Sequence, residues 1–365
     1  MSGDAVPFTR TKLERRPSVA IMAISQVVAT AAAVAAYVAI LAIARRRRRI
    51  IIRPLTSSRF CAVVTGVDVA ALSDVTYDNI RNAFHSHGGL LLIRGQERCC
   101  EMPAAVKAFA ARFGTLETNE KYHRMKMEHQ LHSEEHQEIL CVGNALGKRS
   151  MLIAVDPSRP LLWHCDDSFR APQPMGSCFF CIQAPSSGAA THFASGTAAW
   201  RALPETRQRE LRKLAAFHDY NALNERLREE NPTRAPLSAE VKKATPPILR
   251  PLVARHPETS EEALYVPGCH IARVVDLTNG AEVPFDAIIP PLVDHVTQPE
   301  RSYAHQWRRG DLIIWDNRNT LHAPSHFDVQ CETRLMWRIT MFGPDITPSP
   351  ETLNAELAET AAALR

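Results

Sequence analysis

Two short motifs, far apart in the chain, place severe limits on its fold. The first, LLWHCDDSF, contains His164 and Asp166, and the second, IIWDNRNTLHA, contains His322, 158 residues after His164. Two imidazoles and one carboxylate form the ligand set of a non-haem Fe(II) site with open coordination positions. In an extended strand, residues two apart point the same way, so His164 and Asp166 can face one metal while Cys165 turns away. The fold must therefore bring the two motifs together.

The segment after the second motif predicts a strand from Arg334 to Phe342. Its sequence, RLMWRITMF, alternates and is rich in β-branched and aromatic residues. Period two places the even-numbered residues, including Arg334 and Arg338, on one face of this strand. A planar guanidinium pairs with a carboxylate through two parallel hydrogen bonds. Two arginines on the metal-facing side therefore indicate a dicarboxylate cosubstrate.

Together these motifs resemble the taurine/2,4-D dioxygenase family (TauD/TfdA) of Fe(II)/2-oxoglutarate-dependent dioxygenases. A lone H-x-D is a weak signal, but a distal His in a WDNR-type strand and an arginine twelve residues after it make the combination specific. The resemblance implies a distorted double-stranded β-helix, or jelly roll. It runs from about residue 60 to residue 345, through CAVVTGVD, HGGLLLIRGQ, FAARFGTLE, WHCDDSF, GAATHFASGTAAWRALPE, HPETSEEALYV, TQPERSYAHQWRRGDLIIWDNRNTLHA and RLMWRITMFG.

The resemblance also implies cofactors and residue roles. The iron ligands of the family fall on His164, Asp166 and His322. The residues that bind the far carboxylate of 2-oxoglutarate in the family correspond to Arg334 and Thr191. Arg338 matches the position that holds the sulfonate in taurine dioxygenase. The implied cofactors are Fe(2+), 2-oxoglutarate and O2. The implied reaction is hydroxylation of a small, anionic organic substrate with release of succinate and CO2.

Three departures from the family pattern leave the substrate open. The chain has GAAT before the strand that begins at Thr191, where the family usually has Gly-Gly-Asp-Thr. Pro-Leu-Leu replaces the polar residues ahead of Trp163, and the loop from His322 to Arg334 is one residue longer than in taurine dioxygenase. Besides binding substrate, Arg338 could assist the cosubstrate or pair with a buried acid such as Asp316.

The order of elements predicts a mostly β fold with peripheral helices, of the α+β class. We expect helices at 77–87, 104–113 and 205–217, and a surface insertion or lid at 225–251. We expect strands at 61–65, 90–94, 139–142, 151–155, 161–166, 177–183, 191–194, 263–266, 272–277, 302–307, 311–316 and 334–342. The expected domains are a basic segment 1–18, a transmembrane helix 19–44, an Arg-rich linker 45–59, the dioxygenase domain 60–345 and a tail 346–365.

The N-terminal part of the chain indicates a single-pass membrane anchor. Residues 19–44 carry no charge, and a helix of this length exceeds a hydrocarbon core of roughly 30 Å. Five arginines follow directly, at 45–49. Lys and Arg are enriched on the cytoplasmic side of membrane helices, so we expect the catalytic domain, which follows these arginines, to lie in the cytoplasm. An organellar targeting segment or a buried helix is the alternative.

The charge balance gives no argument for a nucleic-acid partner. Residues 1–59 hold 11 Lys and Arg against 2 Asp and Glu, whereas the remaining 306 residues hold 32 against 37. The catalytic region is therefore mildly acidic and lacks the basic patch with interleaved aromatic residues that nucleic-acid grooves need. Nine cysteines, an odd number, fit a reducing compartment better than a disulfide framework. The sequence leaves the oligomeric state open.

Two other functions compete with the dioxygenase. His132 and His136 form an H-x-x-E-H pattern, which on a helix binds zinc in some peptidases. An apolar strand follows almost at once, at 139–142, so a solvated His-rich loop is the preferred interpretation. The chain could instead be a membrane-tethered, non-catalytic binding protein that retains the dioxygenase fold. The complete ligand set with Arg334 and Thr191 argues against that alternative.

Overall fold

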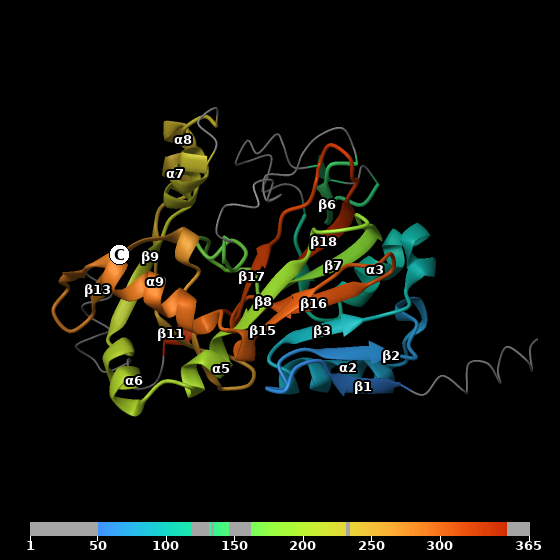
Figure 1. Cartoon of the computed structure of the whole chain (residues 1–365), viewed down its shortest axis with the longest axis horizontal. Coiled ribbons are helices and arrows are strands. Elements are labelled where there is room, and N and C mark those ends of the chain that lie inside the picture. The colour runs from blue at the N-terminus through green and yellow to red at the C-terminus, as the bar shows by residue number, and fades with distance from the viewer. Residues whose placement is uncertain (1–49, 119–130, 133–134, 146–161, 231–233, 349–365) are drawn as a thin grey trace, which may run out of the picture. The chain divides into compact units, whose positions relative to one another are not determined.

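A computed structural model of the protein describes residues 50–118, 131–132, 135–145, 162–230 and 234–348 (Figure 1). The basic segment and transmembrane helix expected at 1–44, the strand expected at 151–155 and almost all of the tail lie outside these residues. Within the described ranges, no helix has both the length and the apolar character needed to cross a membrane.

A large mixed sheet forms one wall of the fold. Its strands, in spatial order, are β1 (Ile51–Pro54), β2 (Ala62–Thr65), β3 (Leu90–Ile93), β16 (Leu312–Asp316), β7 (Gly176–Gln183), β18 (Leu335–Phe342), β6 (Ile139–Gly143) and β5 (Leu131–His132), and β4 (Thr115–Leu116) also pairs with β18. All pairs are antiparallel except β2 with β3.

Three smaller antiparallel sheets complete the β structure. The first is β15 (Ser302–His305), β8 (Thr191–Ser195) and β17 (Thr320–Pro324). The second is β10 (Ile248–Pro251), β9 (Leu214–His218), β13 (Ile271–Asp276) and β14 (Glu282–Val283). The third is β12 (Glu262–Leu264), β11 (Val253–Arg255) and β19 (Thr347–Pro348).

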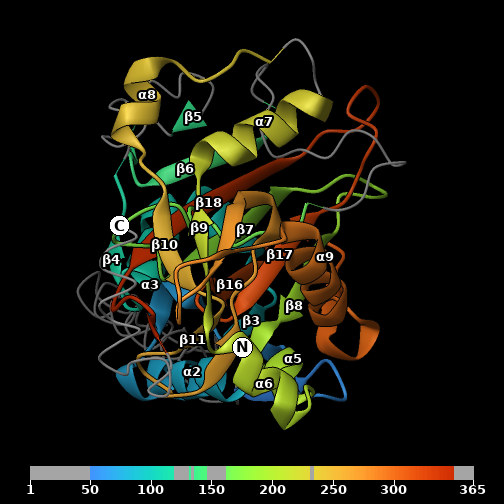
Figure 2. The same ribbon diagram turned by 90° about the vertical axis from the view of Figure 1, so that its left-hand side faces the viewer.

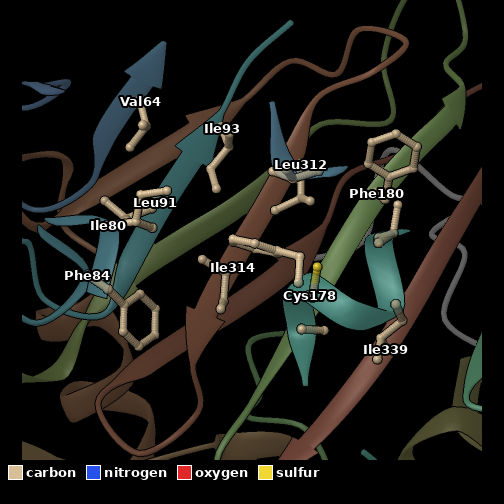
Figure 3. Close-up of a cluster of buried hydrophobic side chains, with 14 of the residues drawn as sticks. Val64, Ile80, Phe84, Leu91, Ile93, Cys178, Phe180, Leu312, Ile314 and Ile339 are labelled. Carbon is tan, nitrogen blue, oxygen red and sulfur yellow. The ribbon is translucent and has the colours of Figure 1, made fainter. Parts of the chain in front are cut away.

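The central strands of the large sheet carry apolar residues on both faces, and both faces are buried over most of β3, β16 and β7. One face packs against helices α2 (Asp74–Ser86) and α3 (Pro103–Ala110). Figure 3 shows this cluster, with Leu91, Ile314 and Phe180 of the sheet lying with Phe84 of α2. The other face meets the sheet of β15, β8 and β17 through a second cluster that includes Phe179, Trp315 and Phe193. The metal motifs lie beside this second cluster.

A separate subdomain is built on β9 and β13. Helices α5 (Gly196–Arg201), α6 (Glu205–Leu211) and α9 (Phe285–Val296) contribute to its core with β11, β12 and β17. Helices α7 (Tyr220–Glu230) and α8 (Ala239–Ala244) follow β9. In both views they lie at the same end of the described region as β5 and β6 (Figures 1 and 2).

The sequence assigned the α+β class and most strands correctly, but three local predictions are wrong. Residues 51–54, expected in the linker, form β1 and pair with β2. The helix expected at 205–217 ends at Leu211, and β9 follows. The expected insertion at 225–251 contains β10, which pairs with β9. His132, which we expected in a solvated loop, lies in β5, and the disfavoured zinc alternative lacks the helix that it needs at this residue.

Candidate metal centre

The backbone brings the two motifs together directly. His164 forms an antiparallel bridge with His322 of β17, and the two residues exchange N–H···O bonds of 2.9 and 2.8 Å. The strand expected at 161–166 is reduced to this bridge, because the chain turns away at Asp167, whose φ is 49°. Cys165 points into the subdomain core, as alternation predicted. One bridge therefore fixes the spacing of both imidazoles.

The side chains of His164, Asp166 and His322 converge on one point. One potential ligand atom from each lies within 4.8 Å of the other two. Oδ1 of Asp166 is 3.9 Å from Nε2 of His164 and 3.6 Å from Nε2 of His322. All three side chains are buried. Two imidazoles and a carboxylate at this spacing match the donor set that binds Fe(II).

Hydrogen bonding prepares His164 for a metal. Its Nδ1 lies 2.8 Å from the carbonyl oxygen of Leu162, so this nitrogen carries the proton and Nε2 keeps a free lone pair. Burial, with a smaller contribution from His322, lowers the pKa of His164 to about 3. The ring is therefore neutral at physiological pH, which is the form that coordinates metals.

Three side chains hold Asp166 in place. Ser177 of β7 donates to Oδ2 over 2.9 Å, and Nη1 of Arg338 lies 3.1 Å from Oδ1. The backbone N–H of Asp166 donates to the side chain of Asn317. Burial alone would raise the pKa of Asp166, but Arg338 and then His322 outweigh it and hold the pKa well below its ordinary value. The carboxylate is therefore ionised and oriented.

Arg334 is a buried cation whose surroundings differ from those of Arg338. Its side chain is 3% exposed, and Nε has no hydrogen-bond partner. Within the described ranges, no acidic side chain forms an ion pair with it, and burial lowers its pKa to about 10. Its backbone N–H donates to Asn144, and its guanidinium lies 5.6 Å from the ring centroid of Phe179. The charge persists at neutral pH and calls for an anion that no residue of the described ranges supplies.

Thr191 connects with Arg334 through two aromatic rings. Its buried Oγ1 accepts a 2.9 Å hydrogen bond from Nε1 of Trp307. The Trp307 ring contacts Phe179 edge-on at 5.3 Å, and Arg334 lies over that same Phe179. Trp307 and Phe179 therefore form an aromatic floor, a surface of two rings that lies between Thr191 and Arg334.

The structure places Arg338 beside the metal ligands. Met336 and Arg338 share one face of β18, whereas Ile339 and Met341 pack in the opposite cluster, as period two predicted. Arg338 does pair with a buried acid, as one alternative had it, but that acid is Asp166 and not Asp316. Asp316 binds Arg318 and His256 instead.

Sequence reasoning missed several supporting residues. Asn144 and Trp307 act through contacts between residues 190 and 116 positions apart, and Ser177 contacts Asp166 across 11 positions. The sequence carries no local signal for these contacts. Asn317 is different because it lies in the WDNR segment of the second motif. Its Oδ1 accepts from both Trp315 and the backbone of Asp166, so it also fixes the first motif.

A cluster from α7 and the loop after Asp166 stands beside the triad. Phe169 contacts Tyr220 at 4.9 Å and the ring of His270 at 5.0 Å. His270 in turn lies 5.9 Å from the ring of His164. Burial lowers the pKa of His270 to about 4, so this ring is neutral as well. The side chains on this side of the triad are therefore aromatic, and one of them is the imidazole of His270.

The comparison with known families decides the assignment. The model of the family described as "Taurine catabolism dioxygenase TauD, TfdA family" matches residues 51–340. The chain belongs to this family. It is an Fe(II)/2-oxoglutarate-dependent oxidoreductase, and its His-Asp-His triad fits that cofactor set. The alternative of a non-catalytic binding protein has no support.

Several curated relatives of this TauD/TfdA enzyme act with alpha-ketoglutarate. An (S)-phenoxypropionate/alpha-ketoglutarate-dioxygenase from Sphingobium herbicidovorans is 29% identical over 309 residues, or 82% of this chain and 96% of the relative. An alpha-ketoglutarate-dependent 2,4-dichlorophenoxyacetate dioxygenase from Cupriavidus pinatubonensis is 34% identical over 180 residues, or 49% and 60%. Pentalenolactone F synthase from Streptomyces arenae is 29% identical over 309 residues, or 80% and 96%.

A solved structure agrees with the TauD/TfdA assignment. The crystal structure of AAD-2 in complex with Mn(II) and N-oxalylglycine matches with a TM-score of 0.62 at 26% identity, and the match covers 82% of this chain and 99% of that one. The sheet-rich α+β fold is therefore that of the family.

Proposed function

We propose that this enzyme hydroxylates a small anionic organic substrate and converts 2-oxoglutarate and O2 into succinate and CO2. His164, Asp166 and His322 would hold the iron. Arg334 and Thr191 would hold the far carboxylate of 2-oxoglutarate. The observation that carries the proposal is the buried charge of Arg334, which has no acidic partner among the described residues and which a dicarboxylate cosubstrate would balance.

Each residue then has a distinct physical task. The bound iron would activate O2 and supply the oxidising chemistry. The buried bridge between His164 and His322 keeps both imidazoles in place before the metal binds. Thr191, held by Trp307, and Arg334 would set the direction of the cosubstrate by fixing its far end. The aromatic floor between them excludes water from that end. We also propose that the two facing sheets form the expected distorted double-stranded β-helix.

The substrate side supports an anionic molecule with an apolar body. Arg338 presents a cation next to the metal ligands, and Phe169 and Tyr220 supply aromatic surface nearby. The named substrates of two relatives, phenoxypropionate and 2,4-dichlorophenoxyacetate, combine an aromatic ring with a carboxylate. We therefore place aryloxy and related apolar carboxylic acids first among the candidates, with Arg338 as the partner of the acid group.

A screen of substrates tests this function. Purified enzyme is incubated with Fe(II), 2-oxoglutarate and one acid at a time, and succinate and hydroxylated product are measured separately. We expect at least one apolar carboxylate to raise succinate release with matching product formation. Its product should fall in the Arg338→Ala variant while basal succinate release persists. Failure of every anionic candidate, with turnover of a neutral one, would remove the proposed role of Arg338.

We also propose that residues 19–44 anchor the enzyme in a membrane as a single-pass helix, with the catalytic domain in the cytoplasm. The support is the uncharged run and the arginines at 45–49. The full-length chain should then resist carbonate extraction from membranes. Protease added to sealed vesicles with the cytoplasmic side inside should spare the catalytic domain. Complete release by carbonate would rule out the anchor.

A further inference from the structure

The loop between β17 and β18 adjoins both residues that we assign to the far carboxylate of 2-oxoglutarate. Residues 325–333, the connecting loop, follow Pro324 at the end of β17 and lead directly into Arg334. The beginning of β8, where Thr191 lies, pairs with the end of β17 just before the loop starts. The connecting loop therefore joins the strand beside Thr191 to Arg334, although it supplies no member of the His-Asp-His triad.

The first half of the connecting loop is fixed to the segment before Thr191. The backbone N–H of Ala189 donates to the carbonyl oxygen of His326 over 2.9 Å, and Phe327 is buried against Ala189. The two backbones also approach closely, because a Cβ at Gly188 would lie 2.6 Å from that same carbonyl oxygen. Two departures from the family pattern, the GAAT segment and the longer loop, therefore pack against each other.

A single amide holds the second half of the connecting loop. Asn144 lies directly after β6, and its Nδ2 donates to the carbonyl oxygens of Val329 and Glu332 over 3.2 and 2.9 Å. Its Oδ1 accepts a 2.8 Å hydrogen bond from the backbone N–H of Arg334. Two acceptors and one donor around the amide fit only this placement of its oxygen and nitrogen. Asn144 therefore ties both the loop and Arg334 to the end of β6.

The backbone of Arg334 is held on both sides. Besides the bond to Oδ1, the backbone N–H of Asn144 donates to the carbonyl oxygen of Arg334 over 3.1 Å. A Cβ at the preceding Gly143, whose φ is +154°, would collide with that oxygen, so only glycine permits the contact. Within the described residues, the buried Nε of Arg334 has no hydrogen-bond partner. The direction of the guanidinium therefore depends on where the backbone of Arg334 is held.

A small displacement of Arg334 would weaken its binding of a carboxylate. Bidentate pairing requires two parallel N–H···O bonds, and each bond weakens as its angle departs from linear. The far carboxylate must at the same time reach Thr191, whose Oγ1 accepts a hydrogen bond from Trp307. The spacing between Arg334 and Thr191 therefore has to match one ligand, and the connecting loop is fixed on both sides of that gap.

We propose that Asn144 is a positioning residue that holds Arg334 at the distance from Thr191 that suits the far carboxylate. Asn144 thereby makes the site selective for 2-oxo acids that carry a second carboxylate. It acts through Arg334 and does not touch the cosubstrate. The inference rests on the proposed function, because it requires Arg334 and Thr191 to hold that carboxylate.

The binding of two 2-oxo acids to the full-length chain tests this role without turnover. The visible absorption of the anaerobic Fe(II) chelate gives a Kd for 2-oxoglutarate and for 2-oxopentanoate, which has a methyl group in place of the far carboxylate. Asn144→Ala should raise the Kd for 2-oxoglutarate about five- to twentyfold and leave the Kd for 2-oxopentanoate within about twofold. An unchanged Kd for 2-oxoglutarate, or equal weakening of both acids, overturns the proposal.

The matched control is another asparagine that ties a loop to its neighbour. The amide of Asn224 in α7 accepts from Arg234 and donates to the carbonyl oxygen of Ala235. Asn224→Ala should therefore change neither Kd.

A double variant tests whether Asn144 acts through Arg334, and it decides the matter even where 2-oxopentanoate binds too weakly to measure. Asn144→Ala combined with Arg334→Ala should bind 2-oxoglutarate no more than about twofold more weakly than Arg334→Ala alone. Additive losses overturn the proposal. If circular dichroism shows that Asn144→Ala does not fold, Asn144→Ser takes its place in both comparisons. If Arg334→Ala binds 2-oxoglutarate as tightly as the wild type, the proposed function fails at Arg334 and the inference fails with it. A loss in Arg334→Ala without one in Asn144→Ala overturns the inference alone.

Discussion

At the scale of single residues, the two arginines near the metal differ in what balances their charge. Arg338 lies 3.1 Å from a carboxylate oxygen of Asp166, so the protein itself compensates it. Arg334 lies among aromatic and apolar side chains and lacks an acidic partner in the described ranges. A buried cation is costly unless it is paired. Arg334 therefore gains most when an anionic ligand binds.

This contrast predicts separate kinetic effects for the two arginines. Arg334→Ala removes the partner of the far carboxylate, and a charge-assisted hydrogen bond contributes about 1.5–3 kcal/mol. The apparent KM for 2-oxoglutarate should rise by roughly one to three decades, measured as succinate release. Arg338→Ala should mainly affect the prime substrate and uncouple succinate formation from hydroxylation. If only the Arg338 variant loses affinity for 2-oxoglutarate, the two roles are exchanged.

At the scale of elements, the turn between β16 and β17 decides where His322 lies. Asp316, fully buried at the end of β16, accepts hydrogen bonds from Arg318 and His256. Burial would raise the pKa of Asp316, but Arg318 and then His256 outweigh it and hold the pKa below its ordinary value. Gly89 makes room for this group. Its φ is +70°, and a Cβ there would lie 2.6 Å from the Cβ of Asp316.

Asp316→Asn should destabilise the fold by about 1.5–3 kcal/mol at pH 7, because it removes one of the two carboxylates that pair with the buried Arg318 and leaves only Glu258. A lowered folded pKa stabilises the protein above the ordinary value of about 4, and this contribution is lost as the pH falls through the folded pKa. The difference between variant and wild type should therefore shrink below about pH 4. Urea unfolding at several pH values measures it, with the exposed Glu282→Gln as the control. Equal stability of Asp316→Asn and wild type at pH 7 would contradict this account.

Strands could be predicted from the sequence more reliably than the boundaries between helix and strand. The β18 segment alternates, and its two faces enter different clusters as period two requires. In contrast, α6 and β9 run together without a proline or glycine between them, so the polar helix and the buried strand merge into one apparent helix. The short strand β1 follows an arginine run and has little apolar pattern of its own. Only its pairing with β2 reveals it.

The pairing of β1 predicts where the chain can be shortened. A chain that begins at residue 50 keeps β1, whose Ile52 packs on the core of the large sheet, and should be soluble and release succinate. A chain that begins at residue 55 exposes the edge of β2 and should unfold at a lower temperature. Thermal unfolding of the two truncated proteins measures the difference. Equal unfolding temperatures would show that β1 adds nothing to the domain.

At the scale of the whole molecule, the sequence predicted the three residues of the His-Asp-His triad that the structure brings together, but not the residues that support them. The three residues of the triad and Arg334 match the family motif in residue type and in spacing. Motif and resemblance were therefore enough to select them. Ser177, Asn144 and Trp307 are ordinary polar or aromatic residues in the sequence. Their importance follows only from the sheet pairings that bring β7, β6 and β15 near the motifs. Those pairings depend on tertiary packing.

The central claim is that one triad binds iron and presents it to 2-oxoglutarate. The most direct measurement is the visible absorption of the anaerobic Fe(II)–2-oxoglutarate chelate during iron titration. The wild type should develop this absorption, and His164→Ala, Asp166→Ala and His322→Ala should lose it while their circular dichroism stays native. Undiminished chelate absorption in all three variants would contradict the account.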